Sequence, residues 1–249
     1  MWGYNTEMSL KLATVNIEGQ KHLEKVRTFI TRENPDVVCL QEVFEDTLEV
    51  VTRDYPYVEF APSLILDQDE ETKEGNRIWG EVIISKYPLV GSRQEYCGEW
   101  SGTNLPRRPQ EDHVPVLVLA DVEKNRIKYR IGTIHFTWTP KATVTEKQRQ
   151  HLKQVLLWIE EEGELLMCGD FNIARENEMY KKLAQVMRDN IPSEVETTID
   201  PNLHYANKKE QGKLKLVVDY VWSTPKYKVK NVRVVSGVSD HCAIVCEVS

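Results

Sequence analysis

The sequence lacks any apolar run that approaches the roughly 20 residues of a membrane-spanning helix, so we expect no membrane span. Its N-terminus lacks a basic segment followed by an apolar stretch, which argues against a signal peptide. Its five cysteines contain no Cys-x-x-Cys pair. Four of them, at 39, 168, 242 and 246, lie in apolar runs. We therefore expect reduced core thiols and an intracellular, cytoplasmic protein.

A surplus of basic residues is also missing. Acidic residues outnumber basic ones by 39 to 32, which gives a net charge of −7. Proteins that bind nucleic acids mainly through charge are usually basic. Any contact with nucleic acid must therefore be local or mediated by a metal ion.

The chain is long enough for one sizeable core, with 249 residues of which 41% are hydrophobic. It shows no shift in composition and no repeat of fixed period. We therefore predict a single domain over residues 1–249, and we expect a monomer.

Apolar residues alternate between the spacing of strands and that of helices. Strands are predicted over 10–17, 36–43, 57–63, 77–85, 114–122, 128–136, 164–172, 216–222, 227–235 and 241–248. Helices are predicted over 20–33, 45–53 and 176–189, and behind a capping box formed by Thr145 and Gln148. Loops are predicted over 67–76, 91–113 and 191–215. Many strands with a few helices between them indicate an α/β fold of packed sheets covered by helices.

Polar side chains stand at or near the ends of six of the apolar runs. They are Asn16, Gln41-Glu42, His135, Asp170 with Asn172, Asp219, and Asp240-His241. Carboxylates, carboxamides and imidazoles gathered in this way from six segments indicate one metal-assisted site.

The residue types suit phosphodiester hydrolysis, which needs an activated water and neutralisation of charge on the phosphoryl oxygens. Glu42 is the best magnesium ligand, because Mg²⁺ prefers one or two carboxylates and keeps its other positions for water and phosphate. Asp170 and Asn172 are two apart, so on a strand both would face one phosphate. His241 as imidazolium would stabilise the transition state, and Asp219 in its apolar run needs a polar partner.

Structural alternatives remain open for these residues. Glu42 would then be a surface residue, Asp170 and Asp240 would be turn residues, and His135 would be a hydrogen-bonded core histidine.

The segments NIEG, QEV, GEVIIS, TIHF, GDFN, VVDYVW and SDH together resemble the endonuclease/exonuclease/phosphatase superfamily, in order from residue 10 to residue 248. That superfamily includes deoxyribonuclease I, exonuclease III-type enzymes, neutral sphingomyelinases, inositol polyphosphate 5-phosphatases and deadenylases. NIEG, QEV, TIH, GDFN and SDH are also similar to the motifs of tyrosyl-DNA phosphodiesterase 2 and of many general nucleases in the superfamily.

The resemblance implies a four-layer α/β sandwich, with two packed mixed β-sheets flanked by helices, and a Mg²⁺ or Mn²⁺ cofactor. It implies that Asp170 positions or deprotonates the attacking water, and that Asn172 donates to the phosphate or orients Asp170. It also implies that Asp219 holds His241 against a non-bridging oxygen.

The resemblance implies further roles for three neighbours of this set. Asn16 would hydrogen-bond Glu42 or the phosphate. His135 would contact the phosphate or assist the leaving group, as in the deoxyribonuclease I and sphingomyelinase branches. Asp240 would support the metal or anchor its loop.

The substrate is the least determined part of the prediction. Candidates for substrate contact are Arg77, Arg107, Arg108 and Trp138. A lysine cluster at 208, 209, 213 and 215 is either solvated surface or a track for a phosphate backbone. Glu81 stands where the superfamily often has Asn.

Three functions stay open at this point. The first is a phosphodiesterase acting on DNA or RNA. The second is a phosphatase or phosphodiesterase acting on a small molecule or a lipid head group, which the acidic net charge favours slightly. The third is a non-catalytic binding module, which has no need of the intact polar set.

Overall fold

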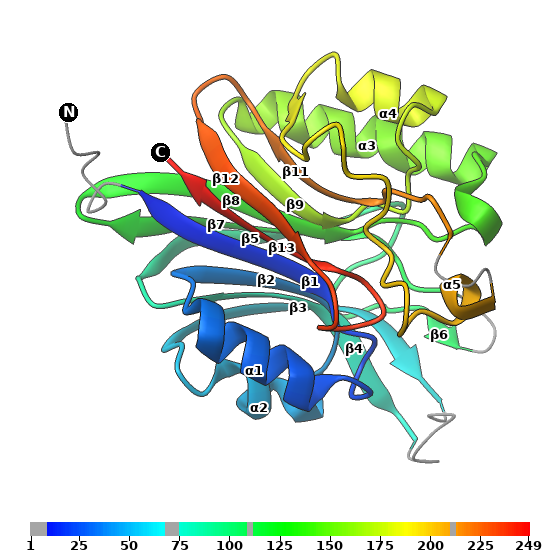
Figure 1. The fold of residues 1–249 in the computed structure, drawn as a ribbon, viewed down its shortest axis with the longest axis horizontal. Helices are drawn as coiled ribbons and strands as arrows, with labels where there is room; N and C mark the ends of the chain where they lie inside the picture. Colours follow the sequence, from blue (N-terminus) through cyan, green and yellow to red (C-terminus); the bar gives the residue numbers. More distant parts are fainter. Residues whose placement is uncertain (1–8, 68–74, 109–111, 210–212) are drawn as a thin grey trace.

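The computed structural model of the chain describes residues 9–67, 75–108, 112–209 and 213–249. It consists of two β-sheets packed face to face, with helices on both outer sides (Figure 1). This arrangement confirms the predicted four-layer α/β sandwich. The sequence features at the N-terminus, and most of the predicted acidic loop over 67–76, lie outside the described residues.

The larger sheet contains seven of the described strands. They are β1 (Leu10–Asn16), β2 (Val37–Phe44), β3 (Tyr57–Leu66), β4 (Arg77–Ser85), β6 (Arg107–Arg108), β12 (Val229–Val235) and β13 (Ala243–Val248). Their order is β12-β13-β1-β2-β4-β3-β6. β1 runs parallel to β2, and β3 runs parallel to β6, whereas the remaining pairs are antiparallel.

The smaller sheet contains six of the described strands. They are β5 (Leu89–Tyr96), β7 (Val116–Lys124), β8 (Ile127–His135), β9 (Leu166–Asp170), β10 (Arg188–Asp189) and β11 (Asp219–Ser223). Their order is β10-β11-β9-β8-β7-β5, with β8 and β9 as the parallel pair. The hairpin between β7 and β8 turns through Asn125 and Arg126, both with positive φ, as a two-residue turn requires.

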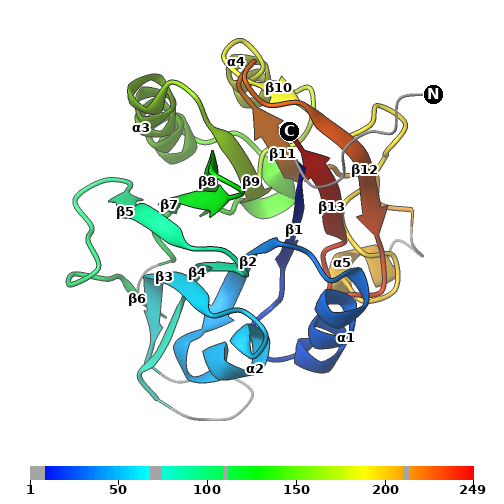
Figure 2. The same ribbon diagram turned by 90° about the vertical axis from the view of Figure 1, so that its left-hand side faces the viewer.

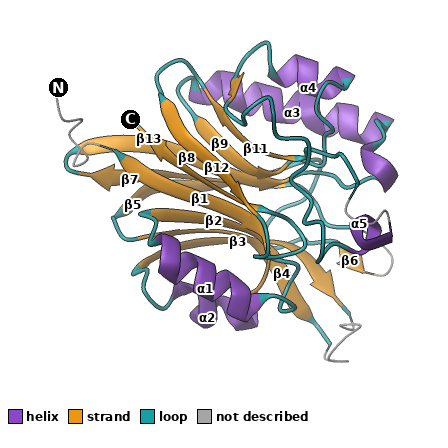
Figure 3. Cartoon of the chain, in the orientation of Figure 1, coloured by secondary structure: helices purple, strands orange, loops and turns teal. Residues whose placement is uncertain are grey.

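The helices cover the outer faces of the sheets (Figures 2 and 3). α1 (Leu23–Glu33) and α2 (Leu48–Thr52), which follows the short η2 (Glu45–Thr47), lie on the larger sheet. α3 (Glu146–Glu162) and α4 (Glu178–Leu183) lie on the smaller sheet. η3 (Pro140–Ala142) and α5 (Tyr205–Lys209) lie in connections at one end of the sandwich. None of the helices in the described ranges combines the length and apolar character of a membrane span.

Local sequence signals account for the two long helices. Thr145 and Gln148 form the predicted capping box at the start of α3, which buries Leu152, Val155 and Ile159. α1 buries Val26, Phe29 and Ile30 and is followed by Asn34 in the left-handed conformation.

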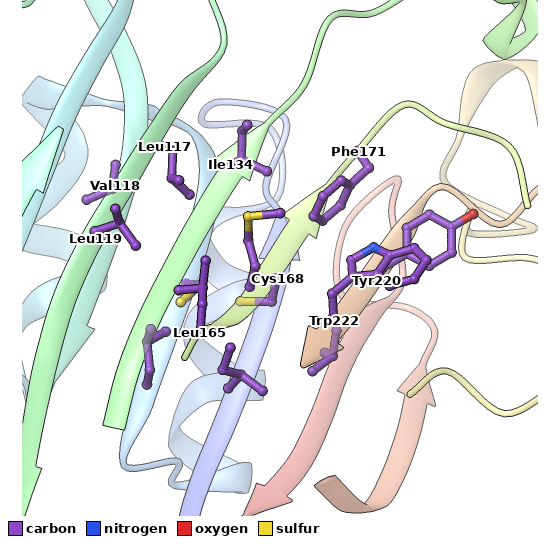
Figure 4. Packing of buried hydrophobic residues seen from close by; sticks show 14 of the residues in the cluster. Leu117, Val118, Leu119, Ile134, Leu165, Cys168, Phe171, Tyr220 and Trp222 are labelled. Carbon is purple, nitrogen blue, oxygen red and sulfur yellow. The ribbon is translucent and has the colours of Figure 1, made fainter. Parts of the chain in front are cut away.

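Apolar side chains fill the space between the two sheets and beneath the helices. All five cysteines are buried and unbridged. Figure 4 shows part of this core around the smaller sheet, with Leu117, Val118, Leu119, Ile134, Leu165, Cys168, Phe171, Tyr220 and Trp222 labelled. The thiols therefore pack as small hydrophobic groups.

The predicted loop over 91–113 was wrong at its start, because β5 continues to Tyr96. β5 is the edge strand of its sheet and its side chains are half-buried or exposed, so it gives no alternating pattern. The predicted helix over 176–189 ends at Leu183, and Arg188–Asp189 pairs with β11 instead.

Two predictions toward the C-terminal part of the chain also need correction. The region 191–215 contains the short helix α5, which its polar composition did not indicate. The strand predicted from 216 begins at Asp219, because the backbone at 216 and 218 bonds to Thr198 instead. Asp219 is therefore the first residue of β11 and not a residue in mid-strand.

Gly169 allows β8 and β9 to approach closely just before the end of β9. Its φ is +130°, and a Cβ atom there would lie 2.2 Å from the carbonyl oxygen of Ile134. It would also lie 3.2 Å from Nε2 of Gln41 in the other sheet. A larger residue would push β9 and its terminal Asp170 out of place.

We predict that Gly169→Ala lowers the free energy of unfolding by more than about 2 kcal/mol, since it adds a backbone clash to an unfavourable φ. Gly163→Ala is the control, because Gly163 also has a positive φ but no atom lies within 4 Å of its Cβ position. Urea unfolding measures both. Equal losses of stability would contradict the packing argument.

Candidate active site

Both sheets deliver polar side chains to the same end of the sandwich, because strands of both end or begin there. Asn16 closes β1 and is opposite Gln41 of β2. Asp170 closes β9, where it is opposite His135 at the end of β8 and Asp219 at the start of β11. His241 lies just before β13. The structure thus brings together the six segments that the sequence singled out.

A β-bulge turns Glu42 toward this end. β2 and β4 change register between Leu40 and Val43, so Gln41 and Glu42 together face Glu81 of β4. Glu42 has a φ of +60°, which breaks the alternation of side chains along β2. Gln41 stays fully buried between the sheets, where its amide donates to Thr133 of β8 at 2.8 Å.

The amide of Asn16 joins the two carboxylates of the site. Its Nδ2 donates to Oε1 of Glu42 at 2.9 Å and to Oδ2 of Asp170 at 3.2 Å. Its Oδ1 accepts from the backbone N–H of Glu18 at 3.1 Å, which fixes which way the amide points. Glu42 and Asp170 come from different sheets, so this single side chain sets their relative position.

Asp219 and His241 form a buried carboxylate–imidazole pair. Nδ1 of His241 lies 2.9 Å from Oδ2 and 3.0 Å from Oδ1 of Asp219. Nε2 of His241 points toward Asp170, with 3.7 Å to Oδ2. Burial alone would lower the pKa of His241, but the carboxylates of Asp219, Asp170 and Asp240 raise it well above its ordinary value. These carboxylates therefore favour the imidazolium form of His241.

His135 lies between the two carboxylates, with its Nε2 3.7 Å from Glu42 Oε1 and 3.6 Å from Asp170 Oδ2. Burial, followed by the charges of His113, His241 and Arg108, lowers its pKa well below the ordinary value, so it is neutral. Its ring stacks on that of His113, with centroids 4.1 Å apart and planes 11° apart. This stack fixes the orientation of His135.

Glu81 is the functional neighbour whose contact the sequence did not reveal. It is fully buried, its Oε1 lies 3.9 Å from Nδ1 of His135, and it accepts a hydrogen bond from Ser63 at 3.2 Å. Burial raises the pKa of Glu81 well above its usual range, so its carboxyl group is neutral. The signal in the sequence was a glutamate inside the apolar segment RIWGEVIIS, where an unpaired charge would be costly.

The prediction that Asp170 and Asn172 share one face of a strand was wrong. β9 ends at Asp170, and Asn172 follows it with a left-handed φ of +49°. The side chain of Asn172 donates to the carbonyl oxygen of Phe136 at 3.0 Å. Its backbone N–H donates to Oδ1 of Asp170 at 2.9 Å, so it orients that carboxylate through the main chain.

The electrostatics of the site show an excess of carboxylate. Burial, and then the charge of Asp240, raises the pKa of Glu42 to about 8. Burial also raises the pKa of Asp170 to about 7, and Asp219 adds to that rise while His241 opposes it. A bound cation would stabilise both ionised groups, and their hard oxygen atoms are the donors that Mg²⁺ and Mn²⁺ accept.

Asp240 lies at the mouth of the site with His204, a residue that the sequence reading did not single out. Ligand atoms of His204, Asp240 and His241 lie within 4.8 Å of one another. Oδ1 of Asp240 accepts only a 3.2 Å bond from the neighbouring Ser239 within the described residues. Its carboxylate therefore remains available to a metal or to an ordered water.

The four predicted substrate-contact residues have different environments. Arg77 is buried, forms two hydrogen bonds with Asp46 and packs 3.6 Å above the ring of Phe44. Arg107 is exposed and pairs with Asp67. Both guanidinium groups thus have carboxylate partners in the protein itself.

Arg108 is half-buried, and Trp138 is exposed. Arg108 packs 5.5 Å from the Trp79 ring, near the His113–His135 stack, and pairs with the exposed Asp112. Trp138 is 56% exposed on the connection that follows His135. Of the predicted lysine cluster, Lys215 pairs with Glu196.

Comparison with protein families gives a match over most of the chain. The endonuclease/exonuclease/phosphatase family model matches residues 13–241. No curated protein sequence matches the chain.

Solved structures of this family have the same fold. An endonuclease/exonuclease/phosphatase protein from Beutenbergia cavernae DSM 12333 is 21% identical, with a TM-score of 0.73 over 96% of this chain and 71% of that one. The human Nocturnin catalytic domain is 20% identical, with a TM-score of 0.67 over 97% and 93%. A mannosyl-6-phosphatase from Bacteroides thetaiotaomicron VPI-5482 is 14% identical, with a TM-score of 0.69 over 96% and 99%.

We predict that Asp219→Asn lowers the pKa of His241, because the nearest negative charge is lost while the ring stays buried. In the metal-free protein the wild-type ring should stay protonated well above pH 6.5, and the variant ring should lose its proton at lower pH. An NMR titration of the histidine ring protons measures this. Asp121→Asn, which removes a carboxylate paired with Arg130, is the control and should leave His241 unchanged. An unchanged pKa in Asp219→Asn would contradict the pairing.

Proposed function

This chain belongs to the endonuclease/exonuclease/phosphatase family, and on that premise we propose that it is a metal-dependent phosphodiester hydrolase acting on nucleic acid. One observation supports this most directly. A continuous chain of short contacts crosses both sheets, and it runs through Glu42, Asn16, Asp170, His241 and Asp219. It combines a proposed metal ligand, a proposed base and a cationic donor in one connected set.

Asp170 is the proposed base for the attacking water. Asn16 and the backbone N–H of Asn172 hold its two oxygens, and its pKa of about 7 lies near the working pH of a cell. A carboxylate with such a pKa accepts a proton efficiently and releases it again. Oδ2 of this carboxylate lies 3.6 Å from Nε2 of His135 and 3.7 Å from Nε2 of His241.

His241 and His135 play complementary roles in the proposal. The Nδ1–H of His241 donates to Asp219, so the Nε2–H of the imidazolium donates to a non-bridging oxygen as charge develops there. His135 is neutral and donates a hydrogen bond to the phosphate or to the leaving oxygen without adding charge. The aromatic stack on His113 keeps this ring in place during the reaction.

The residues present fit a magnesium or manganese ion. Glu42 would hold the ion. Asp240 would supply a second carboxylate, and its charge raises the pKa of Glu42. Such an ion neutralises phosphoryl charge and polarises the scissile group when it is bound. The raised pKa of Glu42 supports this assignment, since a buried carboxylate without a cation is costly.

Nucleic acid is the substrate that the surface near His135 favours. Trp138 is 56% exposed three residues beyond His135, and an exposed indole provides a stacking surface for a base. A small phosphoester is the second candidate. The net charge of −7 favours a small phosphoester. Arg77 and Arg107 favour it too, because Asp46 and Asp67 already neutralise their charges, which leaves less positive charge for a nucleic-acid backbone.

We predict that Asp170→Asn lowers kcat by at least about a hundredfold, because it removes the base while keeping its shape. The assay uses single-stranded DNA, single-stranded RNA, a 5′-phosphotyrosyl oligonucleotide and bis-p-nitrophenyl phosphate, with and without Mg²⁺ or Mn²⁺. Metal-dependent cleavage of an oligonucleotide by the wild type supports the main proposal. Cleavage of the small ester alone supports the second candidate, and undiminished activity of the variant would refute Asp170 as the base.

We also predict that the metal-free protein binds Mn²⁺ more tightly as the pH rises from 6 to 8. Below its pKa of about 8, Glu42 is protonated and must lose that proton to bind the ion. Glu42→Gln should bind weakly and with less dependence on pH, and isothermal titration calorimetry measures both proteins. Wild-type affinity that does not change over this range would contradict the assignment of Glu42.

A further inference from the structure

Backbone hydrogen bonds hold the segment that leads into α5 against the loop that carries Asp240 and His241. The backbone N–H of Cys242 donates to Thr198 at 2.7 Å, and that of Asp200 donates to Asp240 at 2.8 Å. The buried carboxylate of Asp200 accepts from the backbone N–H of Gly237 at 2.6 Å and from that of Leu203 at 2.8 Å. The start of α5 is therefore fixed relative to His241 and its neighbours.

His204, directly before α5, reaches the site itself. Its ring meets that of His241 edge-on, with centroids 6.0 Å apart. Its Nδ1 accepts from the backbone N–H of Asn207 at 3.4 Å, so in the neutral ring the proton is on Nε2. His204 presents a hydrogen-bond donor at the edge of the phosphate site.

Tyr205 follows His204 and is the most exposed large hydrophobic side chain in the described part of the chain, at 71%. The ammonium group of Lys209 lies 4.3 Å from the centroid of its ring. An exposed aromatic ring provides a surface on which a base can stack, and this one lies on a segment that is hydrogen-bonded to the loop carrying Asp240. A cation at the same ring adds affinity for phosphate.

The charge on α5 contrasts with the acidic chain around it. Lys208 and Lys209 end the helix, and neither has a carboxylate partner among the residues that the structure describes. A local positive charge next to an open aromatic ring is the combination that proteins use to bind a single strand without sequence preference. A duplex does not fit it, because its bases are already stacked on one another.

We infer that α5 forms a nucleotide-binding subsite beside the catalytic centre. The ring of Tyr205 stacks on a base of single-stranded nucleic acid, and Lys209 binds the adjoining backbone phosphate. His204 donates to a phosphate oxygen between that base and the scissile bond. This inference rests on the proposed function and extends it by naming a single strand as the bound form.

The test uses the Asp170→Asn protein, which should retain its binding groups, and a fluorescent single-stranded DNA 12-mer. Fluorescence anisotropy should show that adding Tyr205→Ala weakens binding about tenfold, as loss of one stacked base does. Tyr205→Phe and Tyr205→Trp should restore it. Tyr57→Ala is the matched control, because Tyr57 is also exposed, at 38%, but lies on β3. Lys209→Ala should make binding less sensitive to salt. The slope of the logarithm of the binding constant against the logarithm of the salt concentration should become shallower by about one, as loss of one phosphate contact predicts.

Turnover by the otherwise wild-type enzyme separates the inference from the proposed function. Tyr205→Ala should lose about tenfold in kcat/KM on the oligonucleotide and nothing on bis-p-nitrophenyl phosphate. Equal losses on both substrates, no loss of oligonucleotide binding, or no measurable oligonucleotide binding to Asp170→Asn would each overturn the subsite. Metal-dependent hydrolysis of the small ester would still support the phosphoesterase function in all of these cases. A wild-type enzyme that hydrolyses neither substrate would instead overturn the proposed function.

Discussion

The amide of Asn16 is the contact on which the geometry of the site depends. It donates to Glu42 of the larger sheet and to Asp170 of the smaller sheet, while the backbone at Glu18 fixes its orientation. The two sheets also meet through apolar side chains and through the Gln41–Thr133 hydrogen bond, but neither of these contacts touches both carboxylates. The amide of Asn16 therefore fixes the distance between the proposed metal ligand Glu42 and the proposed base Asp170.

Because the carboxylates of Glu42 and Asp170 lie close together, it is costly to ionise both of them. The half-buried Glu42 and the buried Asp170 share one amide, and the pKa of each is raised, to about 8 for Glu42 and about 7 for Asp170. His241 carries a positive charge that Asp219 beside it balances, and His135 stays neutral between Glu42 and Asp170. The remaining deficit of positive charge is what a divalent cation and its phosphate substrate would resolve together.

Much of this arrangement could be predicted from sequence, because buried strands and polar strand ends leave strong local patterns. Asp219 is an example, since a lone carboxylate in an apolar segment requires a polar partner, and the resemblance to the family indicated that this partner is His241. The bulge at Glu42 and the end of β9 before Asn172 could not be predicted, because they depend on pairing between strands. His204 stands in a polar segment whose fold comes from long-range backbone bonds, so no periodicity marks it.

The central claim is that one phosphate is held between a metal on Glu42 and the cation of His241. Anomalous diffraction from crystals of Asp170→Asn grown with Mn²⁺ and a phosphodiester substrate tests this most directly. The account expects manganese bound to Glu42, with the scissile phosphate touching both the metal and Nε2 of His241. Manganese bound elsewhere, or a phosphate that does not contact His241, would contradict it.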